Sequence, residues 1–145
     1  MSAERVIANL LRIAREDLEG ARMLNTRGNR NAIYLCEQAA EKIMRAVLTS
    51  EQIHAGVRHQ LDEMVSLVPD DNPIKPRLRA LQHLSTYATS YRYTTPTGRI
   101  PDDPSTEEVE AAAQNIEAAL IEAAGRFGVD LEAIDVPAAN KSPIR

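Results

Sequence analysis

Apolar side chains recur at steps of three and four residues near the start of the chain, and this spacing constrains the fold more strongly than any other feature. Such steps place the side chains on one face of an α-helix. The members of this apolar face are Ile7, Leu10, Leu11, Ala14, Leu18, Ala21 and Leu24. Charged residues occupy the opposite face, among them Arg12, Glu16 and Arg22. The segment is therefore predicted to be an amphipathic helix that packs one side against the rest of the protein.

Two later segments repeat this pattern. The first follows the sequence NTRGN, in which Gly28 suits the left-handed end of a helix. Its apolar residues are Ile33, Cys36, Ala40, Ile43 and Val47. The second follows Ser105 and Glu108, whose spacing is that of a capping box. Its apolar residues are Val109, Ala112, Ala113, Ile116, Ala119, Leu120, Ala123 and Phe127. Because about four residues join the first two helices, these are expected to lie antiparallel.

The middle of the chain is less regular. A short helix is predicted around residues 61–68, and the proline-rich sequence PDDNPIKP ends it. A longer helix is then predicted over residues 78–91, and no segment shows the alternation that is typical of a strand. The sequence thus predicts an all-α, up-and-down bundle of four to five helices in residues 1–128. Residues 129–145 are expected to form a frayed C-terminal tail.

Composition agrees with closely packed helices and bears on the location of the protein. Aromatic residues make up 3% of the chain and tryptophan is missing, so the core must consist of aliphatic side chains. A single cysteine, Cys36, excludes an intramolecular disulfide and suits a reducing compartment. The N-terminal region lacks the apolar core of a signal peptide, and no stretch reaches the roughly 20 apolar residues of a membrane span. A cytoplasmic protein without membrane contact is therefore expected.

Charge is unevenly distributed along the chain, whose net charge is −4. Residues 102–145 contain ten Asp or Glu and three Lys or Arg, whereas the remainder is mildly basic. This asymmetry favours head-to-tail packing of helices or a polarised surface. It does not favour general nucleic-acid binding through the overall charge.

The sequence YATSYRYTTPTGRIPDDPS gathers three of the four tyrosines where a helical pattern gives way to a loop. Its candidate binding residues are Tyr87, Tyr91, Arg92, Tyr93 and Arg99. Tyrosine and arginine are the residues that dominate protein interfaces, and the arginines also suit a phosphate-bearing ligand. Alternatively, the tyrosines pack the loop against the bundle and the arginines pair with acidic residues nearby. The sequence leaves both interpretations open.

Motifs for catalysis or metal binding are sparse. The histidines His54, His59 and His83 are far apart, so no metal site and no cofactor are expected. Arg77 and His83 form the one candidate catalytic pair, because an arginine that stabilises a phosphorane and a histidine that moves a proton suffice for metal-free RNA cleavage. On one continuous helix these two side chains would point about 120° apart. Cleavage would therefore need a helix break or a dimer.

Four elements in order resemble the HEPN domain family (higher eukaryotes and prokaryotes nucleotide-binding). A first helix carries Ala14, Asp17, Leu18 and Ala21 in an A-x-x-D-L-x-x-A pattern, and QAAEK follows at residues 38–42 of the second, with Arg45 where lysine is common. Residues 58–61 are similar to a T-H-D-L element. Residues 87–93 are similar to a Y-x-x-x-R-Y-P element, in which Thr94 replaces the proline.

This resemblance implies a helical bundle that is usually a homodimer. Many members are binding or regulatory partners of a minimal nucleotidyltransferase, and the R-Y-P element, here Tyr91, Arg92 and Tyr93, is suggested to line a nucleotide or partner surface. Other members are metal-independent endoribonucleases of toxin–antitoxin systems, with an Arg-x4–6-His motif near the last long helix. The match here, Arg77 and His83, precedes the tyrosine element and lacks the polar residue after the arginine. The expected function is therefore that of a non-catalytic, dimeric partner protein that binds a nucleotide, with the ribonuclease as the alternative.

Overall fold

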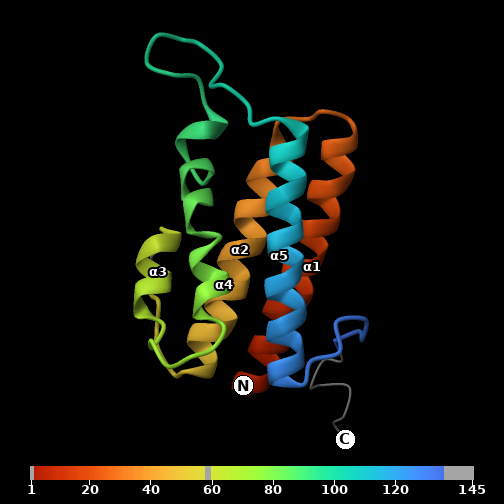
Figure 1. The fold of residues 1–145 in the computed structure, drawn as a ribbon, viewed down its shortest axis with the longest axis vertical. Helices are drawn as coiled ribbons and strands as arrows, with labels where there is room; N and C mark the ends of the chain where they lie inside the picture. Colours follow the sequence, from red (N-terminus) through yellow and green to blue (C-terminus); the bar gives the residue numbers. More distant parts are fainter. Residues whose placement is uncertain (1, 58–59, 136–145) are drawn as a thin grey trace, which may run out of the picture.

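The computed structural model describes residues 2–57 and 60–135. Within these ranges the chain forms five α-helices and two short 3-10 helices, and no strand (Figure 1). The helices are α1 (Ala3–Thr26), α2 (Asn31–Ser50), α3 (Leu61–Leu67), α4 (Lys75–Arg79), η1 (Gln82–Tyr87), η2 (Ser90–Arg92) and α5 (Thr106–Phe127). The predicted all-α bundle is confirmed.

Three long helices form the centre of the bundle. The chain runs up α1, down α2, up through α4, η1 and η2, and down α5, while α3 lies beside the third of these columns (Figure 1). α2 is buried on most of its circumference because α1, α5, α3 and η1 all pack against it. Alanines at the contacts, such as Ala14, Ala21 and Ala40, are fully buried and allow the helix backbones to approach closely. The core is aliphatic, as the composition requires.

The turn from α1 to α2 is tight. Gly28 adopts a left-handed conformation with φ of 66°, which a glycine adopts without strain. The backbone N–H of Asn29 donates to the carbonyl of Leu24, and the Asn29 side chain accepts from the N–H of Asn31 at the start of α2. These bonds satisfy groups that the two helix ends would otherwise leave unpaired. The predicted antiparallel pair follows from this turn.

The helix predicted over residues 78–91 is not continuous. α4 ends at Arg79, and the chain continues as η1 and η2, with Thr89 between them at φ −130° and ψ −75°. The segment is rich in serine and threonine (Ser85, Thr86, Thr89 and Ser90), whose side chains compete for backbone hydrogen bonds and lower the helix propensity. The Ser85 hydroxyl accepts a hydrogen bond of 2.6 Å from the backbone N–H of Leu61 at the start of α3.

α5 begins and ends as its sequence predicts. The Ser105 hydroxyl accepts from the backbone N–H of Glu108 at 3.0 Å, and the Glu108 carboxylate accepts from the N–H of Ser105 at 2.8 Å. Together they form the capping box, and the hydrogen bond that the Ser105 N–H donates to the carboxylate is the main cause that lowers the pKa of Glu108. Gly128 ends the helix at φ 64°.

Residues 130–135, called the strap below, turn back along α1. The carbonyls of Asp130 and Leu131 accept from Arg12 and Arg15, and Asp135 pairs with Arg5. We expected a frayed tail from residue 129; its first part lies against α1, and residues 136–145 lie outside the described ranges. None of the described helices combines the length and apolarity needed to cross a lipid bilayer.

Candidate functional site

The Arg92 side chain lies between two tyrosine rings at the end of η2. Its Cζ is 4.7 Å from the ring centre of Tyr34 on α2 and 5.6 Å from that of Tyr93. Its Nη1 also lies 3.4 Å from the Tyr34 hydroxyl. A cation over an aromatic face gains about 0.5–1 kcal/mol at an exposed site. We call Tyr34, Arg92 and Tyr93 the Arg92 rim.

The Arg92 rim is open to solvent. Arg92 is exposed and Tyr93 is 65% exposed, whereas Tyr34 is half-buried against the bundle. Tyr93 has φ −127° and ψ 167°, so the extended backbone carries its ring away from the preceding 3-10 turn. The two rings therefore hold a cationic group in place without covering it, which suits a ligand or partner that carries negative charge or a flat ring.

Tyr91 has a different role from its neighbours. It is buried, and its hydroxyl donates to Asp103 Oδ1 at 2.7 Å and lies 3.1 Å from the carbonyl oxygen of Arg30. The Arg30 guanidinium stacks on the Tyr91 ring at 4.2 Å, donates to the Tyr91 carbonyl and pairs with Asp103 at 2.9 Å. Burial, together with the bond to Asp103, raises the pKa of Tyr91. Its polar groups are thus engaged inside the protein.

Tyr87 supports Tyr91 and borders a groove. The two rings meet edge to face with centres 4.9 Å apart and planes at 87°. Burial is the main cause that raises the pKa of the half-buried Tyr87. The groove has a volume of about 450 Å³. Its walls come from η1, η2 and the arm, the name used below for residues 93–104: Thr86, Tyr87, Ser90, Tyr91, Thr94, Thr95, Pro96, Pro101 and Asp102.

Arg99 lies in the arm, which projects from the end of the bundle (Figure 1). A turn closes the tip, where Gly98 has φ 84° and the N–H of Thr95 donates to the carbonyl of Arg99. The Arg99 guanidinium pairs with Asp102 at 3.7 Å, and both side chains are largely exposed. Arg99 thus pairs within the arm itself, as expected from the interpretation in which the arginines pair with acidic residues nearby.

The candidate catalytic pair is divided between two elements. Arg77 lies on α4, and its Nε donates to the Glu122 carboxylate of α5 at 2.7 Å. This bond is the main cause that lowers the pKa of Glu122. His83 lies exposed on η1, beyond the break in the helix. The Arg77 guanidinium is therefore engaged by a carboxylate, which competes with a developing phosphorane for its N–H groups.

Other reactive groups are few in the part of the chain that the structure describes. Those residues contain no group of three or more His, Cys, Asp or Glu side chains that could hold a metal ion. His59 lies outside them. Cys36 is buried, and burial raises the pKa of its thiol to about 12, so it remains protonated and poorly nucleophilic at neutral pH.

A polar network links α1 to α2 close to the Arg92 rim. Lys42 donates to Asp17 of α1 at 2.7 Å and lies 3.4 Å from Gln38, whose amide donates to the buried Glu37 at 2.8 Å. With Tyr34, these side chains follow α2 at steps of four residues. The residues that carry the A-x-x-D-L and QAAEK patterns thus meet in the folded protein and fix the two helices against each other.

Sequence reasoning missed Tyr34, Arg30 and Asp103. Tyr34 lies outside the apolar face of its helix, and its spacing from Gln38 and Lys42 was an available signal for a polar stripe. Arg30 and Asp103 stand in turns 73 residues apart, and no local pattern connects them. The fold is what brings all three beside the tyrosine element.

One comparison with known proteins identifies a family. The family model described as "HEPN domain" matches residues 7–124, which include most of α1, most of α5 and every helix between them. No curated protein and no solved structure matches the chain.

Proposed function

Since its residues 7–124 match that model, the chain belongs to the HEPN domain family, and we propose that it is a non-catalytic, homodimeric partner of a minimal nucleotidyltransferase that binds a nucleotide at the Arg92 rim. The observation that supports this proposal is the position of Arg92 between Tyr34 and Tyr93. A side chain that is already held in place loses little conformational freedom on binding. The exposed face of Tyr93 offers a stacking surface for a base, and Arg92 offers a donor for phosphate.

The positions of the candidate catalytic residues Arg77 and His83 also favour a binding role. Arg77 is bound to Glu122, and His83 lies on a separate element, whereas Arg92 has aromatic neighbours and no carboxylate among its partners in the described ranges. An arginine without an acidic partner is the better phosphate ligand. Arg92 is therefore the stronger candidate for a phosphate contact.

The proposal is tested by calorimetry of ATP binding to the full chain. The double variant Arg92→Ala/Tyr93→Ala is expected to bind ATP at least tenfold more weakly than the wild type, with unchanged helicity by circular dichroism. Arg79→Ala is the matched control, because it removes an exposed arginine of α4 far from the rim. Equal affinity of the double variant and the wild type would contradict nucleotide binding at this place.

The partner and the homodimer need separate measurements. A tagged chain is expected to retain a nucleotidyltransferase, identified by mass spectrometry, and the double variant is expected to lose it. Sedimentation is expected to give twice the chain mass of 16.0 kDa. A monomer that retains no nucleotidyltransferase would reject the proposed assembly.

A further inference from the structure

One face of α1 carries a row of arginines, which we call the arginine row: Arg5, Arg12, Arg15 and Arg22. Steps of seven, three and seven residues keep them on one side of the helix. Acceptors from the C-terminal third of the chain meet each of them. Arg22 pairs with Glu110 and Glu117 of α5, and the other three contact the strap. The arginine row therefore contacts side-chain carboxylates and backbone carbonyls.

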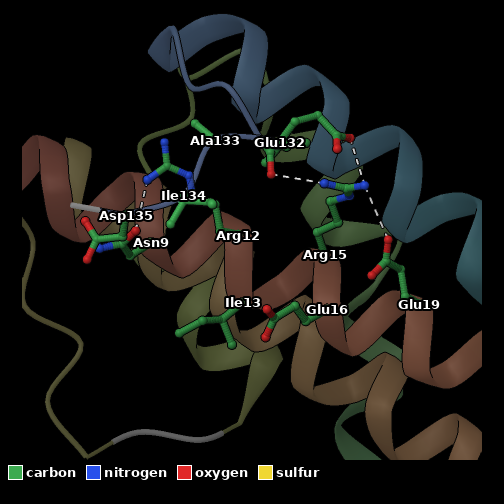
Figure 2. A pocket seen from close by; sticks show the side chains of 11 residues that line it. Asn9, Arg12, Ile13, Arg15, Glu16, Glu19, Glu132, Ala133, Ile134 and Asp135 are labelled. Carbon is green, nitrogen blue, oxygen red and sulfur yellow. Dashed lines mark hydrogen bonds and ion pairs between the residues drawn. The ribbon is translucent and has the colours of Figure 1, made fainter.

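The strap meets the row with backbone carbonyls and acidic side chains, after a turn in which the Ala133 N–H donates to the Asp130 carbonyl (Figure 2). Arg15 donates to the Leu131 carbonyl at 3.1 Å and pairs with Glu132 at 2.7 Å. Arg12 donates to the Asp130 carbonyl at 3.2 Å. Arg5 grips both carboxylate oxygens of Asp135, which lowers the pKa of that group. Backbone carbonyls and acidic side chains are the groups that the row recognises.

The strap is weakly held. The Glu132 side chain is 76% exposed, and the pair of Arg5 with Asp135 is about one-third exposed on each side. Exposed pairs of this kind contribute little to stability. Leu131 packs against the core, but Ile134 is 87% exposed and buries almost nothing. A segment with better apolar contacts would therefore displace the strap.

Space for such a segment is present on α1. A pocket of about 540 Å³ lies between α1 and the strap, with Ile13 at one side and Arg12 and Arg15 at the other (Figure 2). A second hollow of about 480 Å³ continues past Ile13 to Val6 and Leu10. Ile13 is 44% exposed, although the next residue, Ala14, is fully buried in the core. The arginine row is thus bordered by unfilled apolar surface.

From these contacts we infer that the arginine row and Ile13 form a docking surface for an acidic segment of a partner protein with aliphatic side chains, and that the strap occupies this surface as an internal competitor. Charge complementarity defines the occupant, because the strap already shows which groups the arginines accept. The strap lies at the end of the bundle opposite the arm (Figure 1), and no residue of the Arg92 rim lines its pocket.

The test compares the full wild-type chain with a strap-released variant, Glu132→Gln/Asp135→Asn. The probe is a fluorescent peptide of the strap sequence DLEAID, and its binding is followed by anisotropy at low salt. If the strap covers the surface in about nine molecules of ten, releasing it raises the apparent affinity about tenfold. Adding Arg12→Gln/Arg15→Gln to the released variant is expected to abolish binding.

Matched controls separate docking from general charge effects. Glu63→Gln/Asp71→Asn removes two exposed carboxylates elsewhere and is expected to leave the affinity of the wild type unchanged. The peptide NLQAIN is expected not to bind. Equal affinity of the wild type and the released variant, or tighter binding of a single-stranded RNA than of the peptide, would overturn the inference. Arg92→Ala is expected to leave peptide binding unchanged, so failure here does not depend on the proposed nucleotide site.

Discussion

At the scale of the residue, Tyr91 and Arg92 show how neighbouring positions separate structure from recognition. Tyr91 turns inward, and its hydroxyl and carbonyl bond to Asp103 and Arg30. Arg92 turns outward and stacks on Tyr34. A buried tyrosine hydroxyl needs partners, whereas an exposed arginine gains from aromatic faces. The tyrosine element is therefore both a packed corner and an exposed surface, with one residue for each task.

Tyr91→Phe is expected to lower the free energy of unfolding by about 1–2 kcal/mol, because Asp103 loses the hydrogen bond that the Tyr91 hydroxyl donates in a part-buried setting. Urea denaturation measures the change. Tyr93→Phe serves as the control, since its ring is largely exposed, and it is expected to be neutral. A Tyr91→Phe protein as stable as the wild type would mean that the hydroxyl contributes nothing to holding the arm.

Cys36 is expected to make stability fall at alkaline pH. Its folded pKa of about 12 lies above the value of 9.0 for an unperturbed thiol, because burial disfavours the thiolate. The unfolded chain therefore ionises first, and the stabilisation that is complete below pH 9 is lost as the pH rises toward 12, by up to about 1.4 kcal/mol per pH unit. Unfolding measured from pH 8 to 11 is expected to show a smaller decline in Cys36→Ala. Parallel curves for the two proteins would refute this assignment.

At the scale of the element, the local sequence pattern was sufficient to predict a helix where that helix buries one face. The periodicity of α1 and the capping box of α5 predicted both helices, because propensity, apolar spacing and end signals agree there. The same reasoning was wrong for residues 78–91, where Leu78, Leu81 and Leu84 do point into the core but the backbone changes to 3-10 geometry. In that segment the Ser85 hydroxyl accepts a hydrogen bond from the N–H of Leu61, 24 residues away, and no local pattern contains this contact.

Ser85→Ala is expected to destabilise α3 by about 1 kcal/mol, since the N–H of Leu61 loses its acceptor at a helix start. Hydrogen exchange of residues 61–67 is expected to accelerate more than that of α1. Ser66→Ala is the control, because its hydroxyl bonds within its own exposed turn. Equal exchange of α3 in the Ser85→Ala variant and the wild type would show that this bond is not needed.

At the scale of the whole molecule, the charge asymmetry of the sequence becomes a contact. Arg15 and Arg22 on α1 pair with Glu132 and Glu117 from the acidic C-terminal third. The sequence indicated such packing but not its register, because that depends on how α5 crosses α1. The candidate site was likewise visible in part: Arg92 and Tyr93 stand out in the sequence, whereas Tyr34 joins them from 58 residues away.

The whole protein is expected to leave RNA intact. Incubation of a structured RNA with micromolar protein in EDTA should yield no cyclic-phosphate ends. The reason is that Arg77 is bound to Glu122, whereas His83 lies exposed on a separate element. Gel analysis and mass spectrometry of the products provide the measurement. Cleavage that disappears in His83→Ala would establish the ribonuclease in place of the binding protein.

The arm determines where this chain tolerates inserted and deleted residues. It joins η2 to α5 by a path outside the packed helices, and the hydrogen bonds at its tip join Thr95 to Thr97, Gly98 and Arg99 of the arm itself. Added or deleted residues there would leave the four columns in register, since loop closure depends only weakly on length. Divergence in length among related chains should therefore concentrate at this connection, and an inserted reporter domain would be accommodated there with the bundle unaltered.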